Sequence, residues 1–344
     1  MPPRESGPPV LEVEELSLEL GIRGRWVQAL DRVSLRIDRG EALGLVGESG
    51  SGKSLTALSV PGLLPANARV TGGAIRVMGE DVLGRSEREL AALRARSVAF
   101  VFQNPTTYLN PVLTVGRQIA EVFERSPELL DTSGRAAGLS RAERRRRGRH
   151  KSIEYLRLVR IPDPERIVDL YPFALSGGMQ QRVVIAMALA RRPHLVIADE
   201  ITTALDVTVQ AQILALLAEL RHQIDMTLLL ITHDLGIVAQ LADRVAVMYS
   251  GSVVESADVR RLFRAPRHPY SRALLQAVPT LHGDRTVFRA IPGSMPAITD
   301  PPAGCRFHPR CPEVFAPCAA SKPALAAVDG GHTVACHLYG GPTG

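Results

Sequence analysis

Short apolar runs recur along most of the chain, and each ends at glycine or at polar residues. The clearest run is 42–46, which leads directly into a glycine-rich segment. Similar runs occupy 97–102, 194–198 and 227–231. Runs of this length without polar alternation are typical of strands buried on both faces, as in a parallel sheet.

Two further strands are expected before these runs, and several helices between them. The strands are 10–20, where apolar and polar residues alternate loosely, and 33–37. A helix is expected to begin near Gly52 and to end before Pro61. Buried strands separated by helices predict an α/β fold with a parallel sheet. A long helical stretch predicts a subdomain at about 105–190, with helices at 115–124, 141–159 and 177–190.

The pattern changes after Ala257. Two helices are expected at 259–264 and 271–277, and the remainder from Pro279 is rich in proline, glycine and cysteine with little periodicity. We therefore predict two domains, 1–257 and 258–344, and expect the second to need a staple because it has few regular elements.

Composition agrees with this plan. Hydrophobic residues make up 45% of the 344 residues but aromatic residues only 4%, so aliphatic side chains must fill the core. No apolar run is long enough to cross a bilayer, and the proline-rich start resembles no secretory signal. We expect a soluble or peripheral protein that reaches a membrane only through a partner.

The net charge of +6 is concentrated in one segment. Residues 141–151 carry seven lysine or arginine side chains and one acid. A solvated helix face is the favoured interpretation, with contact to anionic lipid or nucleic acid as the alternative. No aromatic residue interleaves with the arginines, which disfavours a stacking surface for nucleic acid.

The first chemical motif is GESGSGKS at 47–54, which fits the P-loop pattern after a buried strand. Its backbone amides and the following helix N-terminus suit a phosphate. Lys53 can reach the β- and γ-phosphates, and the Ser54 hydroxyl can ligate Mg²⁺. The residues predicted to bind ATP are Gly47, Ser49, Gly50, Ser51, Gly52, Lys53, Ser54 and Leu55.

The second motif is the apolar run that ends in Asp199 and Glu200. We predict that Asp199 holds Mg²⁺ near Ser54 and that Glu200 polarises the attacking water. Alone this ending is weak evidence, but it gains weight downstream of a P-loop.

The third motif, LSGGMQQR at 175–182, resembles the signature of ABC-type ATPases. The resemblance implies a P-loop NTPase with a RecA-like parallel core and added antiparallel β and α-helical subdomains. It also implies that the signature of one subunit caps the γ-phosphate of ATP bound on a second subunit. The residues carried over to that role are Ser176, Gly177, Gly178 and Gln180.

The remaining family motifs follow in order. Gln103 resembles the Q-loop glutamine that touches Mg²⁺ and couples to the membrane subunit, and Asp206 resembles the D-loop aspartate at the dimer interface. His233 resembles the switch histidine that contacts the γ-phosphate. The family's adenine-stacking position falls on or near Leu20, which has no π-face. We leave the adenine contact unassigned, with Trp26 or another neighbour as a substitute.

Further segments resemble the dipeptide, oligopeptide and nickel importers of this family. They are Asn104-Pro105, Leu109-Asn110-Pro111, Thr114-Val115-Gly116, residues 202–212, His268-Pro269-Tyr270, Ile291-Pro292-Gly293, Gly304-Cys305 and Arg310-Cys311-Pro312. The resemblance implies a heterodimer with a second homologous ATPase at the cytoplasmic face of the membrane. It also implies two transmembrane permease subunits and an extracytoplasmic solute-binding protein.

All four cysteines, Cys305, Cys311, Cys318 and Cys336, lie in the C-terminal segment. Four thiolates can staple such a segment by binding metal. In the resembled subfamily this segment is associated with a [4Fe–4S] cluster, which Cys₄ ligation suits. Zinc is less favoured because its usual close cysteine pairs are absent, and four reduced thiols are the remaining alternative.

The favoured function is therefore an ATP-hydrolysing subunit that powers uptake of dipeptides or oligopeptides. The same motor could serve nickel or another small solute. A soluble ABC ATPase acting on nucleic acid or ribosomes is disfavoured, because such proteins typically carry two cassettes and this chain has one P-loop; no nucleic-acid partner is expected. A non-hydrolysing subunit is disfavoured because Glu200 and His233 are both intact.

Overall fold

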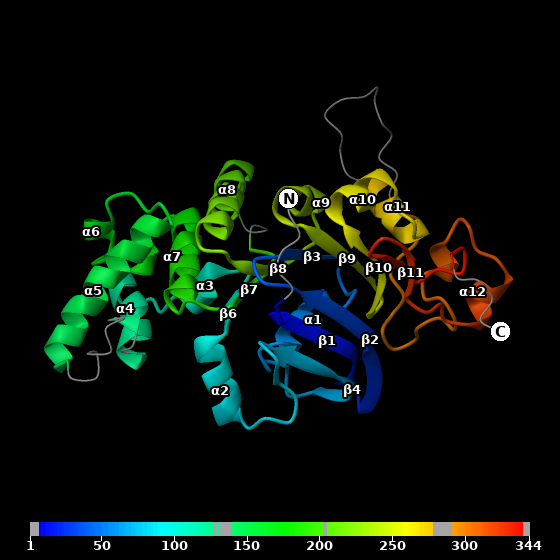
Figure 1. Cartoon of the computed structure of the whole chain (residues 1–344), viewed down its shortest axis with the longest axis horizontal. Coiled ribbons are helices and arrows are strands. Elements are labelled where there is room, and N and C mark those ends of the chain that lie inside the picture. Colours follow the sequence, from blue (N-terminus) through cyan, green and yellow to red (C-terminus); the bar gives the residue numbers. More distant parts are fainter. Residues whose placement is uncertain (1–6, 127–128, 131–138, 202–204, 278–290, 340–344) are drawn as a thin grey trace. The chain divides into compact units, whose positions relative to one another are not determined.

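The computed structural model describes residues 7–126, 129–130, 139–201, 205–277 and 291–339. The chain forms two compact units (Figure 1). One combines residues 1–90 with 227–344, and the other contains residues 91–226. The C-terminal segment from 258 onward, called the extension below, belongs to the first unit.

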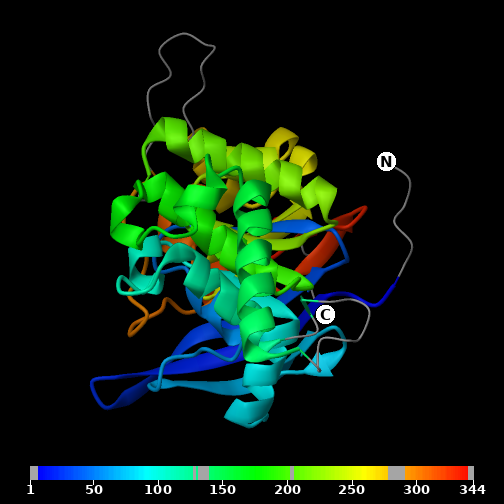
Figure 2. The same cartoon turned by 90° about the vertical axis from the view of Figure 1, so that its left-hand side faces the viewer.

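An antiparallel sheet begins the first unit. Its strands lie in the order β2 (Arg25–Ile37), β1 (Leu11–Ile22), β4 (Ala68–Val77) and β5 (Glu80–Asp81). The β1–β2 hairpin is the long blue ribbon of Figure 2. The expected strand 33–37 is thus only the end of a continuous strand, and β4 and β5 were not predicted.

A second sheet holds the phosphate-loop sequence. Strand β3 (Ala42–Val46) is wholly buried and pairs in parallel with β8 (Thr227–Thr232) and β9 (Arg244–Tyr249). Strand β10 (Ser252–Asp258) continues antiparallel to β9. The extension then adds β12 (His332–Val334) to β10, and β11 (Ala326–Asp329) to β12. The segment expected to be irregular therefore supplies two strands.

The first unit also contains five described helices. They are α1 (Lys53–Ser59), α9 (Leu235–Leu241), α10 (Val259–Arg264), α11 (Pro269–Gln276) and α12 (Ala316–Ala320), with a 3₁₀ turn at His308–Arg310. Helices α1, α9 and α10 contact this sheet. Helix α10 matches the prediction residue for residue.

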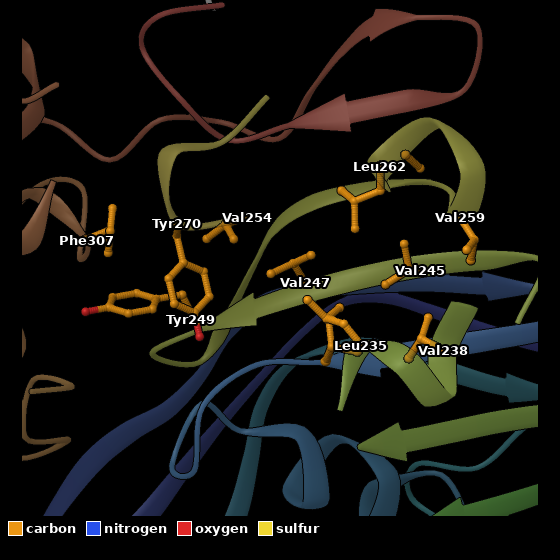
Figure 3. Close-up of a cluster of buried hydrophobic side chains, with 12 residues drawn as sticks. Leu235, Val238, Val245, Val247, Tyr249, Val254, Val259, Leu262, Tyr270 and Phe307 are labelled. Atoms are coloured by element: carbon orange, nitrogen blue, oxygen red, sulfur yellow. The ribbon is translucent and has the colours of Figure 1, made fainter. Parts of the chain in front are cut away.

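One core joins the sheet to the extension (Figure 3). Tyr249 of β9 packs edge-on against Phe307, with ring centroids 5.1 Å apart, and against Tyr270, at 4.7 Å. All three side chains are at most 1% exposed. The extension therefore shares its hydrophobic core with the sheet that carries the phosphate loop.

The second unit contains two parallel strands and a set of helices. Strands β6 (Val98–Val101) and β7 (Leu195–Asp199) pair so that Val101 lies opposite Ala198. Helix α2 (Glu87–Arg96) leads into this unit. The other helices are α3 (Pro105–Tyr108), α4 (Val115–Arg125), α5 (Arg141–Leu158), α6 (Pro164–Ile167), α7 (Gly177–Ala190) and α8 (Val207–Gln223), with a 3₁₀ turn at Pro172–Ala174.

The basic run lies on α5, whose start is fixed by a capping box between Ser140 and Glu143. Gly148 permits close packing of α5 on α4, since an added Cβ would lie 3.2 Å from Cβ of Ala120. Arg149 forms an ion pair with Asp169 at 2.7 Å. Among the described residues, no helix combines the length and apolar character that a membrane crossing requires.

Replacing Phe307 by alanine is expected to lower the free energy of unfolding by about 3 kcal/mol, because it empties the centre of the shared core. Denaturant unfolding of the purified chain measures the change. Phe315 in the same extension is 43% exposed, so Phe315→Ala is the matched control, with an expected effect within about 0.5 kcal/mol. Equal losses from both substitutions would contradict the packing described here.

Candidate active site

The phosphate loop, Gly47 to Ser54, leaves β3 where the chain meets the backbone of β9. Gly47 has φ 153°, and an added Cβ would lie 2.2 Å from the carbonyl oxygen of Met248. Gly52 has φ 104°, and its Cβ would lie 2.7 Å from the Leu30 side chain. Both positions therefore require glycine for conformation and for space.

Lys53 is 5% exposed, and its ammonium group is turned back toward the loop. Its Nζ donates to the carbonyl oxygens of Gly47 at 2.8 Å and Glu48 at 3.0 Å, and lies 3.5 Å from Oγ of Ser51. The amide of Ser51 donates to the carbonyl of Glu48 at 3.2 Å. The oxygens of the loop thus surround the Lys53 ammonium group. Gly47 and Gly52 set the curvature of the loop.

Helix α1 begins without a side-chain cap. Its N-cap residue, Gly52, makes no side-chain hydrogen bond, and its first turn contains no acidic residue; the whole of α1 lies within the described residues. Uncapped N–H groups at a helix start carry partial positive charge and suit an anion. Ser54 lies in this first turn and is exposed.

His233 lies at the same sheet edge as the loop. Strands β3 and β8 are paired so that Val46 lies opposite Thr232, and each is followed by a predicted site residue, Gly47 or His233. The next residue, Asp234, caps α9 by accepting from the amide of Gly236 at 2.7 Å. The first unit therefore brings the loop and the histidine to one edge.

The second unit brings together a separate set of predicted residues. Because β6 and β7 are parallel neighbours, Gln103 just beyond β6 and the Asp199–Glu200 pair at the end of β7 lie at adjacent strand ends. Glu200 has φ 47°, a left-handed conformation that is uncommon for a residue with a side chain and is frequent at functional sites. Burial raises the pKa of Tyr108, and the nearby Asp199 charge adds to that shift.

The signature segment starts α7. Ser176 is its N-cap, and the hydroxyl accepts from the amide of Met179 at 3.4 Å. Gly178 has no room for a side chain, since an added Cβ would lie 2.5 Å from Val209. Gln180 is 9% exposed and donates to the carbonyls of Pro172 and Leu175, at 3.0 and 3.2 Å. In this structure the Gln180 amide therefore stabilises the turn at residues 172–175, at the start of the signature segment.

Asp206 and Trp26 also have clear local roles. Asp206 is the N-cap of α8, and its carboxylate accepts from the amide of Val209 at 2.9 Å. Trp26 is 47% exposed, and the Arg69 guanidinium lies 4.1 Å from its ring centroid. One face of the indole is therefore already covered by a cation. Residues 202–204, part of one segment that carried the family resemblance, lie outside the described residues.

The four cysteines lie within electrostatic range of one another. Burial raises the pKa of Cys305, Cys311 and Cys336, the last to about 11, and neighbouring thiols contribute to each shift. The amide of Cys305 donates to the carbonyl of Cys318 at 2.8 Å. Within the described ranges, however, no group of three or more His, Cys, Asp or Glu side chains is arranged to hold a metal ion. The donor chemistry suits a metal, and the side-chain arrangement does not form a ligand set.

Sequence reasoning missed the partners of Glu48 in the loop. Its amide donates to the Tyr270 hydroxyl, and its carboxylate accepts from Arg310, both from the extension. The His268-Pro269-Tyr270 segment was noticed only as part of a resemblance. His268 is the N-cap of α11, and its Nδ1 accepts from the amide of Tyr270 at 3.0 Å.

A phosphate loop on a parallel strand, a histidine at the neighbouring strand end and a serine-capped glycine pair at a helix start define an ATP-binding cassette ATPase. The chain belongs to the ABC transporter family: residues 30–203 match the family described as ABC transporter. Residues 254–318 match the family described as oligopeptide/dipeptide transporter, C-terminal region.

Two relatives are similar over nearly the whole chain. The dipeptide transport ATP-binding protein DppD of Escherichia coli strain K12 is 45% identical over 328 residues, covering 95% of this chain and 96% of DppD. The oligopeptide transport ATP-binding protein AppD of Bacillus subtilis strain 168 is 42% identical over 331 residues, covering 96% and 97%.

Solved structures agree. The dimeric post-hydrolysis state of the ATP-binding cassette MJ0796, bound to ADP and Pi, covers 73% of this chain and 99% of its own, with a TM-score of 0.59 and 28% identity. The ABC fold and ATPase class predicted from the sequence are thereby confirmed.

Burial lowers the pKa of His268 from 6.5 to about 3, and the nearby Arg272 charge adds to the shift. The unfolded chain therefore binds more protons between these two values, so the free energy of unfolding should fall as pH drops from 6.5 toward 3. The largest slope is about 1.4 kcal/mol per pH unit from this group.

Unfolding curves measured across this range, compared with those of His268→Asn, isolate the contribution. Asparagine can still cap α11 but does not titrate. The variant should show a shallower slope, and parallel slopes would contradict the assignment.

Proposed function

We propose that this chain is the ATP-hydrolysing subunit of an importer of dipeptides or oligopeptides, attached to the cytoplasmic face of the membrane by permease subunits. The observation that carries the proposal is the combined match of an ABC cassette and an oligopeptide/dipeptide transporter C-terminal region in one chain. Relatives named for dipeptide and oligopeptide transport cover the same span.

The chemistry assigned to each residue follows from its position. In the proposed site, the loop amides and Lys53 grip the phosphates, and His233 contacts the γ-phosphate from the neighbouring strand end. Glu200 acts as the base that polarises the attacking water. The hydrolysis of ATP would be accelerated by positioning of the reacting groups and by stabilisation of the charge on the transferred phosphate. Phosphoryl transfer needs little covalent chemistry from the protein.

Mg²⁺ suits the donors proposed for it, which are the Ser54 hydroxyl, the Gln103 amide oxygen and the Asp199 carboxylate. Hard oxygen donors are what this cation prefers. When bound, it would neutralise charge on the transferring phosphate.

The signature would act on a second subunit's nucleotide. In this proposal Ser176 and the amides at Gly177 and Gly178 cap the γ-phosphate bound by a partner ATPase. The packing of Gly178 supports this assignment. Val209 leaves no room for a side chain at Gly178, so only backbone is present at this position of the first turn of α7. A heterodimer with a homologous subunit, two permeases and an extracytoplasmic binding protein complete the proposed importer.

Exposed apolar side chains in the second unit support a permease contact. Val112 is 74% exposed and Phe173 is 76% exposed. Tyr171 stacks on Phe173 with ring centroids 5.6 Å apart, and Tyr108 stacks on Phe102 at 4.1 Å. Exposed aromatic residues are typical of protein interfaces.

Glu200→Gln is expected to abolish ATP hydrolysis in the assembled importer, at least about a hundredfold, while ATP binding is retained. The amide keeps the shape of the carboxylate but cannot accept the water's proton. Phosphate release from proteoliposomes and nucleotide binding to the purified chain measure the two effects. Glu219→Gln changes a half-buried acid on α8 that forms an ion pair with Arg160; it is the matched control and should hydrolyse at the parent rate.

The same proteoliposomes distinguish the solutes. With the cognate binding protein present, a dipeptide or oligopeptide should stimulate hydrolysis, and Ni²⁺ or RNA should not. If Ni²⁺ alone stimulated hydrolysis, the proposed solute would be a metal ion and not a peptide. Stimulation by RNA in the absence of permeases would contradict the assignment as an importer. Parent-rate hydrolysis by Glu200→Gln would refute the assigned base.

We also propose that the four cysteines, whose side chains form no ligand set in this structure, hold a [4Fe–4S] cluster when it is bound, with zinc as the alternative. The mutual electrostatic influence of the thiols supports their grouping in space. The choice of a [4Fe–4S] cluster over other metal centres rests on the resemblance to peptide importers. Its role would be structural, because the four cysteines lie in the extension, away from the residues proposed to act on ATP.

Protein purified without oxygen should be brown and contain about four iron atoms per chain. The variant Cys305→Ser/Cys318→Ser should lose both colour and iron. Metal analysis and absorption spectra provide the readout, independent of ATPase activity. A colourless anaerobic sample with one zinc per chain would establish the zinc alternative, and a metal-free sample would leave four reduced thiols.

A further inference from the structure

Glu48, the second residue of the phosphate loop, is held by two side chains of the extension. Arg310 meets its carboxylate with both arms of the guanidinium: Nη1 donates to Oε2 at 2.8 Å and Nη2 donates to Oε1 at 3.1 Å. The Tyr270 hydroxyl accepts from the backbone amide of Glu48 at 2.9 Å. The side chain and the backbone of one loop residue are therefore both fixed from outside the loop.

Arg310 is itself rigidly placed. Its side chain is only 5% exposed. Its Nε donates to the carbonyl of Pro292 at 2.8 Å, and Nη1 also donates to the Tyr249 hydroxyl at 3.3 Å. A buried guanidinium with partners on several sides has little freedom to move, so it can define the position of the carboxylate that it grips.

Tyr270 is equally constrained. It is fully buried, and its ring packs edge-on against Tyr249 in the shared core (Figure 3). The start of α11 is fixed by the buried Glu255, whose carboxylate accepts from the amides of Arg267 and His268 at 2.7 and 2.9 Å. The position of the Tyr270 hydroxyl is thus fixed by the packing of its ring and by the hydrogen bonds at the start of α11.

The Glu48 peptide is connected directly to the groups proposed to bind phosphate. Its carbonyl accepts from Nζ of Lys53 and from the amide of Ser51. Because glycine precedes Glu48 and another glycine follows Ser49, the loop has little stiffness of its own. Fixing Glu48 from outside would preorganise the loop and reduce the entropy lost on binding.

Charge gives Arg310 a second effect. Glu48 places a carboxylate in a loop proposed to receive a polyphosphate, and like charges repel. The bidentate guanidinium neutralises that carboxylate. Removal of Arg310 would leave an unpaired negative charge beside the phosphates.

We propose that Arg310 and Tyr270 are positioning residues of the phosphate loop, through which the extension sets the affinity of this chain for ATP. The inference rests on the proposed assignment of the loop to ATP. It gives the extension a role in nucleotide binding in addition to any metal that the cysteines hold.

The test measures binding of Mg²⁺·ATP to the full-length chain by calorimetry, with folding checked by thermal unfolding. Arg310→Met should raise Kd about tenfold and Tyr270→Phe about threefold. The kcat of the assembled importer at saturating ATP should stay within about twofold of the parent value, because Arg310 and Tyr270 act on binding rather than on the reacting atoms.

The decisive comparison is Arg310→Met combined with Glu48→Gln. If the guanidinium acts by neutralising the carboxylate, this double variant should bind ATP more tightly than Arg310→Met alone. Arg272→Met is the matched control, since Arg272 forms a similar bidentate pair with Glu313 inside the extension, at 2.6 and 3.2 Å. Its Kd should equal that of the parent chain.

The outcomes separate this inference from the proposed function. A parent chain that does not bind ATP would refute the loop assignment itself. A parent chain that binds ATP, together with folded Arg310→Met and Tyr270→Phe variants of unchanged Kd, would overturn the inference alone. If Arg310→Met does not fold, Arg310→Lys and Tyr270→Phe carry the same test, and unchanged Kd in both would also overturn it.

Discussion

Strand β3 ends so close to the backbone of β9 that only glycine can follow it. At Gly47 the carbonyl oxygen of Met248 occupies the place of a side chain, and the chain must turn out of the sheet at that point. The turn determines where Lys53 begins α1 and which carbonyls surround its ammonium group. The same parallel sheet places His233 at the end of the next strand. A steric constraint between two backbones thus sets the position of the phosphate loop beside the end of the neighbouring strand.

The functional segments of both units are junctions that lead into helices. Short polar side chains cap the helices that follow: Asn104 for α3, Ser176 for α7, Asp206 for α8 and Asp234 for α9. Each such residue satisfies backbone groups that would otherwise be orphaned at a helix start. Helix α1 differs, because glycine at its N-cap supplies no side-chain oxygen.

Local signals were sufficient for β3, α7 and α10, which match the expected bounds because glycines, a serine cap and an aspartate cap delimit them. Helix α8 was not predicted: it begins with Val207-Thr208-Val209, which favours a strand, and its remainder is apolar without a clear stripe. The motif order predicted which residues belong to the site. It could not indicate that Tyr270 and Arg310 meet Glu48, because 222 and 262 residues separate the partners and only the folded core brings them together.

The last strands of the extension have a consequence for the integrity of the whole first unit. Strand β12 covers part of the free edge of β10, with Glu255 opposite Val334 and Ser256 opposite Thr333. A chain that stopped at the end of the cassette would leave these peptide groups without partners and bare to the solvent. Open edges of this kind recruit strands from other molecules and promote aggregation. Premature termination or proteolytic trimming of the tail would therefore threaten solubility as well as transport.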